Sequence, residues 1–213
     1  MNPLVCHRCG DLVELPVDPG APLSCGACAH RQEFVRQPLY CLAGPSGTGK
    51  STLARLLLPR LRGRFVVLEQ DVLWVPELRD PTDEHRAFRS TWLRLAAMIG
   101  QNGRPVLLCG TVVPPELEPL PERALFSAVH YLALTCEPDV LARRLRARPA
   151  WREWDEPRIA EMLAYADWLR AEAATLNPPV TLLDTTERDV ESTAQEVCRW
   201  LGRLAGCESG WGG

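Results

Sequence analysis

The residues best suited to chemistry lie together in residues 44–51, which read Gly-Pro-Ser-Gly-Thr-Gly-Lys-Ser. A glycine, four residues and then Gly-Lys-Ser form the phosphate-binding P-loop pattern. Its glycines let successive backbone N–H groups point into one concavity, which holds phosphate oxygens. Lys50, the only lysine of the chain, would reach the β- and γ-phosphates of a nucleotide, and the Ser51 hydroxyl would ligate Mg²⁺. The expected contacts to the nucleotide come from Gly44, Ser46, Gly47, Thr48, Gly49, Lys50, Ser51 and Thr52.

Asp71 is the second candidate for chemistry, because it comes just after residues 64–68, a mostly apolar run typical of a strand. In open α/β sheets, ligands lie beyond the carboxyl ends of the strands. The Asp71 carboxylate would therefore face the phosphates, where it would take a proton from an acceptor hydroxyl or help to hold Mg²⁺. Glu69 is the weaker candidate for this role. The alternative interpretation of Asp71 is an ordinary acid in a strand-end loop.

Several arginines gather in residues 137–148, which open with Glu-Pro-Asp, a sequence typical of the start of a helix. Leu141 and Leu145 form its apolar stripe. Arg144 and Arg148 would bracket a triphosphate and stabilise the charge on the phosphoryl group during its transfer. A solvated basic helix is the alternative.

Four cysteines near the N-terminus have the spacing of a metal site. Cys6 and Cys9 form one C-x₂-C pair, Cys25 and Cys28 form a second, and fifteen residues separate the pairs. This spacing predicts a four-cysteine site for a structural Zn²⁺, since a closed site of this kind leaves no open position for catalysis. The segment resembles the zinc ribbons. Residues 1–37 contain three arginines and four acidic residues, so they lack the basic surface of a nucleic-acid-binding ribbon.

The spacing of apolar residues gives the elements that must position these side chains. Strands are expected over residues 39–43, 64–68, 104–109, 128–134 and 180–186. Helices are expected from about residue 49 to 58, over 84–99, from about 137, and over 156–174 and 189–204. Thr82 or Asp83 would cap the helix over 84–99, and the four prolines of residues 114–121 predict a loop. No acidic residue ends the strand over 104–109, so the usual Walker B aspartate is missing and its duty falls to Asp71.

Length and composition fit one α/β domain with a small appendage. The chain has 213 residues and a net charge of -3, so no bulk charge favours nucleic acid or an anionic membrane. No apolar run approaches the roughly 20 residues of a membrane span, and the N-terminus lacks a signal pattern, so the cytoplasm is the expected location. The expected domains are a ribbon over residues 1–37, a nucleotide-binding domain over 38–206 and a flexible tail over 207–213.

From residue 39 to about 205, the chain resembles the small P-loop kinases of the nucleoside and nucleotide kinase-like superfamily. Gluconate kinase, shikimate kinase and chloramphenicol phosphotransferase are relatives in this group. Residues 44–51, Asp71 and residues 137–148 carry the resemblance, and residues 183–186 are similar to the loop that passes the adenine in these kinases. The resemblance implies a P-loop NTPase fold with three α/β/α layers and a five-stranded parallel sheet. It also implies ATP with Mg²⁺, phosphoryl transfer, and nucleotide contacts from Asp184 and Thr185.

The expected activity is transfer of the γ-phosphoryl group of ATP to a hydroxyl of a small molecule, such as a nucleoside. Residues 110–114 lack the arginine that nucleoside monophosphate kinases carry after the third strand, which weakens a monophosphate acceptor. The alternative is a P-loop ATPase, or a polynucleotide kinase, that the ribbon directs to RNA or DNA. The missing basic surface in residues 1–37 disfavours this alternative.

Overall fold

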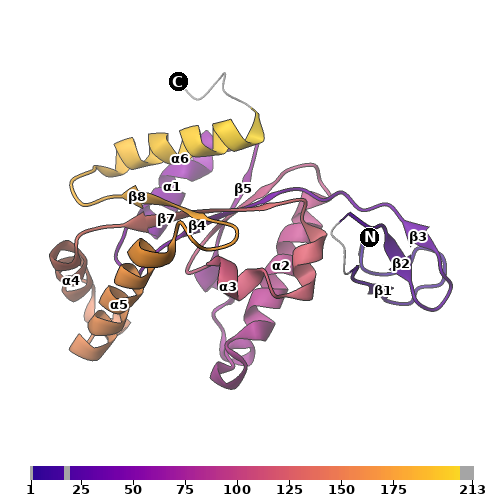
Figure 1. Ribbon diagram of the computed structural model, residues 1–213, viewed down its shortest axis with the longest axis horizontal. Coiled ribbons are helices and arrows are strands. Elements are labelled where there is room, and N and C mark those ends of the chain that lie inside the picture. Colours follow the sequence, from indigo (N-terminus) through magenta and orange to yellow (C-terminus); the bar gives the residue numbers. More distant parts are fainter. Residues whose placement is uncertain (1, 17–19, 207–213) are drawn as a thin grey trace.

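The structure, a computed structural model, describes residues 2–16 and 20–206. The expected tail over residues 207–213 lies outside the described part. Two separate sheets are present, a small antiparallel one near the N-terminus and a five-stranded parallel one that forms the centre of the fold. Figure 1 shows the small sheet beyond one end of the layered part of the molecule.

The parallel sheet confirms the expected fold class. Its strands are β4 (Leu39–Ala43), β5 (Val66–Glu69), β6 (Val106–Cys109), β7 (Val129–Thr135) and β8 (Val180–Asp184). They lie in the order β5-β6-β4-β7-β8, and every neighbouring pair is parallel. All five residues of β4 are buried, as a strand covered on both faces must be. This central strand ends at Ala43, directly before the P-loop.

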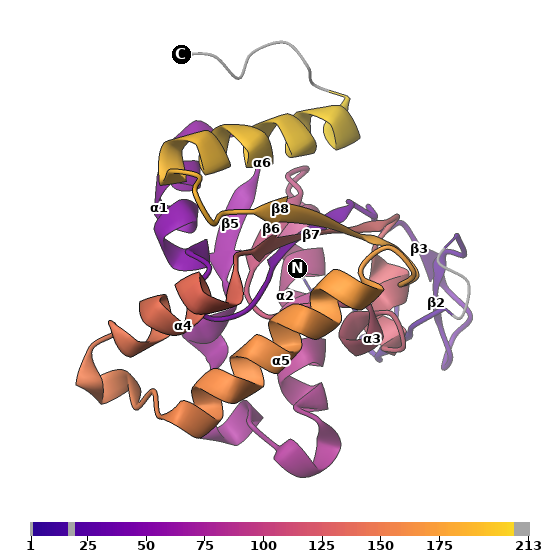
Figure 2. The same ribbon diagram turned by 60° about the vertical axis from the view of Figure 1, so that its left-hand side comes forward.

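Helices cover both faces of this sheet (Figures 1 and 2). They are α1 (Lys50–Arg60), α2 (Arg86–Gly100), α3 (Pro114–Leu117), α4 (Pro138–Arg146), α5 (Glu156–Glu172) and α6 (Val190–Ala205). Alternate residues of β4 serve the two faces: Tyr40 and Leu42 pack with α1 and α6, whereas Cys41 packs in the cluster that includes α2 and α5. This is the period of two that a strand imposes. Among the described residues, no helix is long and apolar enough to cross a membrane.

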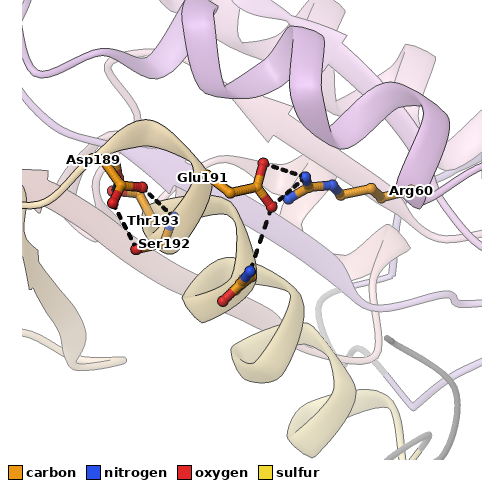
Figure 3. A network of polar contacts seen from close by, with 6 residues as sticks. Arg60, Asp189, Glu191, Ser192 and Thr193 are labelled. Carbon is orange, nitrogen blue, oxygen red and sulfur yellow. Dashed lines mark hydrogen bonds and ion pairs between the residues drawn. The ribbon is translucent and has the colours of Figure 1, made fainter. Parts of the chain in front are cut away.

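The first turn of α6 ties the two helices of one layer together (Figure 3). The Asp189 carboxylate accepts hydrogen bonds from the Ser192 backbone N–H (2.6 Å) and the Ser192 hydroxyl (3.0 Å), which is the geometry of an N-cap. One residue into the helix, Glu191 forms an ion pair with Arg60 at the end of α1, with a distance of 2.6 Å between Nη2 and Oε2. This ion pair therefore links the end of α1 to the first turn of α6.

The segments between these elements contain short 3₁₀ turns, which in the described residues are Gln70–Leu73, Pro76–Leu78, Pro81–Asp83, Pro121–Leu125 and Ala150–Arg152. The structure differs from the sequence-based expectation at two places. The expected loop over 114–121 contains the single helical turn α3, because adjacent prolines fit the first helical positions, where no backbone donor is needed. Helix α2 begins two residues later than expected, since Glu84 and His85 have φ values of +45° and +59° and cannot join it. The expected cap at Thr82 or Asp83 was therefore wrong. Asp80 caps the preceding 3₁₀ turn instead.

The small sheet consists of β1 (Val13–Glu14), β2 (Leu23–Cys25) and β3 (Arg31–Gln32), all antiparallel. Val13 and Leu23 belong to the same hydrophobic cluster as residues of β4, α2 and β6. Hydrogen bonds cross from this segment to the rest of the chain. The Gln101 amide bonds both backbone groups of Val35, and Arg36 Nε donates to the Ala124 carbonyl at 2.9 Å. The N-terminal segment is thus packed against the end of α2.

Candidate functional site

The P-loop lies where the topology of the sheet makes a crevice. The chain leaves β4, forms the loop and α1, and continues to β5 at the edge, whereas β7 lies on the other side of β4. Ligands of open α/β sheets bind at such a switch point, beyond the carboxyl ends of the strands. Gly44 has a φ of +125°, and a Cβ there would lie 2.3 Å from the Leu134 carbonyl oxygen. The loop can therefore approach β7 this closely only with glycine at position 44.

The Lys50 ammonium is folded onto this loop. Its Nζ donates to the carbonyl oxygens of Gly44 (2.6 Å) and Pro45 (2.9 Å). Burial lowers the Lys50 pKa from 10.5 to about 8, while the negative charge of Asp71 acts in the opposite direction. These carbonyls hold the cation at the rim of the phosphate concavity, where phosphate oxygens would replace them.

One cavity of about 590 Å³ collects most of the residues that the sequence singled out. The expected site residues that line it are Ser46, Gly47, Gly49, Lys50, Ser51, Thr52, Asp71 and Arg148, together with Glu69. They come from the P-loop with the start of α1, the end of β5 and the segment after α4. The cavity is large enough for a triphosphate and a second small molecule.

The turn that presents Asp71 is fixed by its neighbour. The Gln70 side chain is buried, and its Oε1 accepts a hydrogen bond from the Thr111 N–H at 2.9 Å. Trp92 Nε1 donates to the Gln70 carbonyl at 3.2 Å. A Cβ at position 110 would lie 2.1 Å from Gln70 Oε1, so Gly110 admits this side chain between the ends of β5 and β6. The turn holding Asp71 is therefore fastened to the next strand and to α2.

A second, smaller hollow of about 320 Å³ is bordered by Gly47, Thr48 and Gly49 of the P-loop and by Thr52. Arg144 lines it and donates to Thr185, from Nη2 to the carbonyl at 3.0 Å and from Nη1 to the hydroxyl at 3.4 Å. The Asp184 carboxylate points instead to Thr186, whose N–H and hydroxyl donate to it at 2.7 and 2.6 Å. Asp184 and Gly44 line neither hollow. Arg144 and Arg148 thus line different hollows.

The far end of the larger cavity contains residues that the sequence analysis did not single out. Trp74, His85 and Glu116 line it, together with Phe88 and Arg89 of α2. Glu116 was not identified because residues 114–121 were expected to form a loop. Pro114 and Pro115 directly before it were a usable signal, since prolines favour the first turn of a helix.

The four N-terminal cysteines come together as expected, with their Sγ atoms within 4.8 Å of one another. The Cys6 and Cys28 sulfurs are 3.7 Å apart and those of Cys9 and Cys25 are 3.5 Å apart. A tetrahedral zinc ion with bonds of about 2.3 Å would place its sulfurs roughly 3.8 Å apart. The cluster therefore fits Zn²⁺ in a closed, four-thiolate site.

The sheet order, the P-loop and the cavity above it define a protein of the P-loop NTPase fold. Residues 41–163 match the model of a family described as an AAA domain. The match spans more than half of the 213 residues, and the chain belongs to this family. No curated protein matches the sequence.

Solved structures similar to this chain include three kinases. A gluconokinase from Sinorhizobium meliloti has 20% identity and a TM-score of 0.54, over 82% of this chain and 96% of that one. A sugar kinase from a Janibacter species has 17% identity and a TM-score of 0.57, over 83% and 100% of the two chains. Shikimate kinase from Bacteroides thetaiotaomicron has 19% identity and a TM-score of 0.51, over 78% and 98%. The chain therefore has the fold of the small P-loop kinases.

Proposed function

We propose that this protein is an ATP-dependent phosphotransferase that moves the γ-phosphoryl group to a hydroxyl of a small molecule. The observation that carries the proposal is the single cavity shared by Lys50, Ser51, Asp71 and Arg148. Phosphoryl transfer asks the protein mainly to position its reactants and to neutralise developing charge. A cation on the loop, a carboxylate opposite it and an arginine from the segment after α4 meet that demand.

In this proposal the triphosphate of ATP binds along the P-loop and its nucleoside extends toward the smaller hollow. Backbone N–H groups of the loop and the start of α1 would bind the phosphate oxygens. Thr185 and Arg144 would border the nucleoside, as their position in that hollow supports. Ser51 and Asp71 offer the oxygen ligands that Mg²⁺ prefers, and the ion would neutralise charge on the phosphates.

The acceptor would then lie beyond the γ-phosphate, at the end of the cavity bordered by α2. Asp71 would orient the acceptor hydroxyl and take its proton late in the transfer. Arg148 would stabilise charge on the transferring phosphoryl group. The gluconokinase, sugar kinase and shikimate kinase among the similar structures support an acceptor of small size.

The N-terminal segment forms the second part of the proposal. We infer that Cys6, Cys9, Cys25 and Cys28 hold a structural Zn²⁺, and that residues 1–37 are a zinc ribbon next to a kinase domain over 38–206. The fit of the sulfur spacing to a tetrahedral ion supports this inference.

The decisive experiment is a screen of nucleosides, sugars and small alcohols for ATP consumption together with a phosphorylated product. Lys50→Ala should lower the rate at least ~10²-fold, because the transferring phosphoryl group loses a fixed cation. Arg55→Ala, on the exposed face of the same helix, is the matched control and should leave the rate unchanged. Near-normal transfer by Lys50→Ala would refute the proposed function.

A further inference from the structure

The end of the cavity bordered by α2 contains an ion pair that limits what can bind there. Arg89 Nη2 lies 2.6 Å from Glu116 Oε1, and both side chains are largely buried, with 15% and 23% of their surface exposed. Arg89 also donates from Nη1 to the Glu84 carbonyl. Both terminal nitrogens of this guanidinium are therefore engaged within the protein.

An anionic acceptor would find no unpaired partner in Arg89. To bind it, a carboxylate or phosphate would have to displace Glu116 and leave that side chain as a buried, unpaired charge next to a second anion. Burial raises the pKa of Glu116, and the charge of Arg89 opposes this effect. Because a buried carboxylate depends strongly on its one counter-ion, the pair favours acceptors that leave it intact.

The other arginines that line the cavity follow α4 in the chain and contact tryptophan rings. Arg148 and Arg158 lie 5.4 and 4.7 Å from the centre of the Trp154 ring, and Arg152 lies 4.6 Å from that of Trp151. Arg148 also interacts electrostatically with Asp71, across the P-loop. The positive charge of these arginines complements the negative charge of a triphosphate. At the α2 end, Arg89 is neutralised by Glu116, so no excess positive charge remains there.

Some buried polar atoms have no hydrogen-bond partner in the protein. In residues 2–16 and 20–206 they are His85 Nδ1, Glu116 Oε2, Trp154 Nε1 and the Tyr165 hydroxyl, and the first three belong to residues that line the cavity. Buried polar groups are nearly always bonded, so each of these atoms calls for a partner. Of these residues, His85 and Glu116 lie with α2 and Arg89 in the cavity lining. The Glu116 carboxylate accepts only, unless it is protonated, and therefore suits a hydroxyl donor.

Aromatic rings complete the wall. The Trp74 ring meets His85 at 4.8 Å and Phe88 at 5.0 Å between centroids, both edge to face. Glu84 and His85 both adopt left-handed backbone conformations at the start of α2. Strain of this kind in non-glycine residues persists where the surrounding structure fixes it, often at ligand sites. Here it holds His85 against Trp74 at the cavity wall.

We propose that the acceptor is an electrically neutral ring compound with several hydroxyl groups, a sugar or a nucleoside. Its apolar ring face packs on Trp74 and Phe88, and its hydroxyls bond the polar side chains that line this end of the cavity, Glu116 and His85 among them. Because Arg89 is already paired with Glu116, this end offers no free cation for a sugar acid or a phosphorylated acceptor, and such acceptors are excluded. This inference rests on the proposed kinase activity and adds the substrate class to it.

Matched pairs of compounds test the charge rule on the intact protein. D-galactose and D-galacturonate differ only in a hydroxymethyl or carboxylate group, as do D-glucose and D-glucuronate. Ribonucleosides and their 5′-monophosphates form a third pair, which separates the nucleoside arm from the sugar arm. We expect kcat/KM for the neutral member of at least one pair to exceed that for its acid by ~10²-fold or more, as for sites whose polar groups must stay paired.

Glu116→Gln tests whether the ion pair sets this preference. The substitution keeps the shape and frees the charge of Arg89, so the neutral-to-acid ratio of kcat/KM should fall at least ~10-fold. The affinity for ATP, measured by calorimetry, should stay unchanged. Glu77→Gln makes the same change at an exposed position outside the cavity and should leave the ratio intact.

The outcomes separate this inference from the proposed function. Phosphorylation of an acid in preference to its neutral partner, or an unchanged ratio in Glu116→Gln, overturns the neutral acceptor and leaves the kinase standing. Failure of the wild-type protein to bind Mg·ATP or to phosphorylate any compound overturns both. If Glu116→Gln does not fold, the comparison of matched pairs on the wild-type protein still decides the charge rule.

Discussion

Lys50 is a cation whose charge depends on pH in the range where enzymes work. Its pKa in the free protein is about 8, because burial disfavours the ammonium. Bound phosphates favour the ammonium and raise this pKa, so ATP binding at pH above about 8 must take up a proton. We expect the Kd for ATP to stay level below about pH 8 and to weaken by up to about tenfold per pH unit above it.

Calorimetry in two buffers with different ionisation enthalpies measures this proton uptake directly. Lys50→Arg is the control, since an arginine keeps its charge throughout this range. Its affinity for ATP should show no step near pH 8, whatever its absolute value. An identical pH profile in the two proteins would assign the step to another group.

Asp71 is the residue on which the proposed chemistry most depends. Asp71→Asn keeps the shape and removes the base, so kcat should fall by ~10²–10⁴, the range of a positioned general base. The Kd for ATP should change little. Steady-state kinetics with calorimetry separate the two effects, and Glu69→Gln, on the same cavity wall, should cost far less. If Asp71→Asn retains most of its kcat, the base is a different group.

Local patterns predicted the strand before residues 44–51 and the helix that begins at their end, because the P-loop pattern itself dictates the backbone. The position of Asp71 followed from a general rule about strand ends. Arg144 and Arg148 show the limit of such reasoning. Their spacing suggests one helix face, but α4 ends at Arg146, so Arg148 lies beyond its last turn and lines the other hollow. Glu116 was missed because its importance comes from Arg89, which is distant in the sequence.

At the scale of elements, the N-cap of α6 makes a testable contribution to stability. Hydrogen bonds from the Ser192 backbone and hydroxyl hold the pKa of Asp189 below its ordinary 3.8. A carboxyl with a lowered pKa in the folded state stabilises the fold at pH above its unfolded value, and the effect disappears as pH falls through the folded value. The cap should therefore act at neutral pH and fail in acid.

Asp189→Ala should lower Tm by a few degrees at neutral pH, as the loss of a cap does in domains of this size. The gap in Tm between this variant and the wild-type protein should close as pH falls below about 4. Thermal unfolding followed by circular dichroism over this pH range measures it. Glu187→Ala removes an exposed acid from the same loop and should show no such gap. A gap that persists in acid would contradict the cap.

Elements with strong apolar periodicity were predicted to within about two residues at most of their ends. The failures occur where local chemistry competes with periodicity. The Asp80 side chain starts a separate turn by accepting from the Thr82 N–H, and the chain then reverses through His85 before α2 begins. Helical spacing in residues 84–99 carries no information about such a reversal.

At the scale of the whole molecule, the N-terminal segment forms a sheet of its own, yet its apolar side chains pack in the same hydrophobic cluster as β4 and α2. Its cysteine spacing predicted the cluster of four sulfurs, but no local pattern indicated that Val13 and Leu23 would join the hydrophobic cluster of β4 and α2. That packing depends on two apolar surfaces that meet only after both parts have folded. The N-terminal segment therefore supports the end of α2, the helix that carries Arg89.

The zinc site gives the last prediction. Elemental analysis should find one Zn²⁺ per chain, and Cys28→Ser should lose it, whereas Cys198→Ser, a thiol buried on α6, should retain it. Because the short strands of the ribbon cannot form a core without the metal, chelation should open β1–β3 to hydrogen exchange while β4 and β7 stay protected. Tm should fall as well, since the two parts share one cluster. A folded protein without metal, or exchange that rises equally in β1 and β4, would contradict a structural zinc ribbon. A separate sheet held by its own ion should lose its protection first.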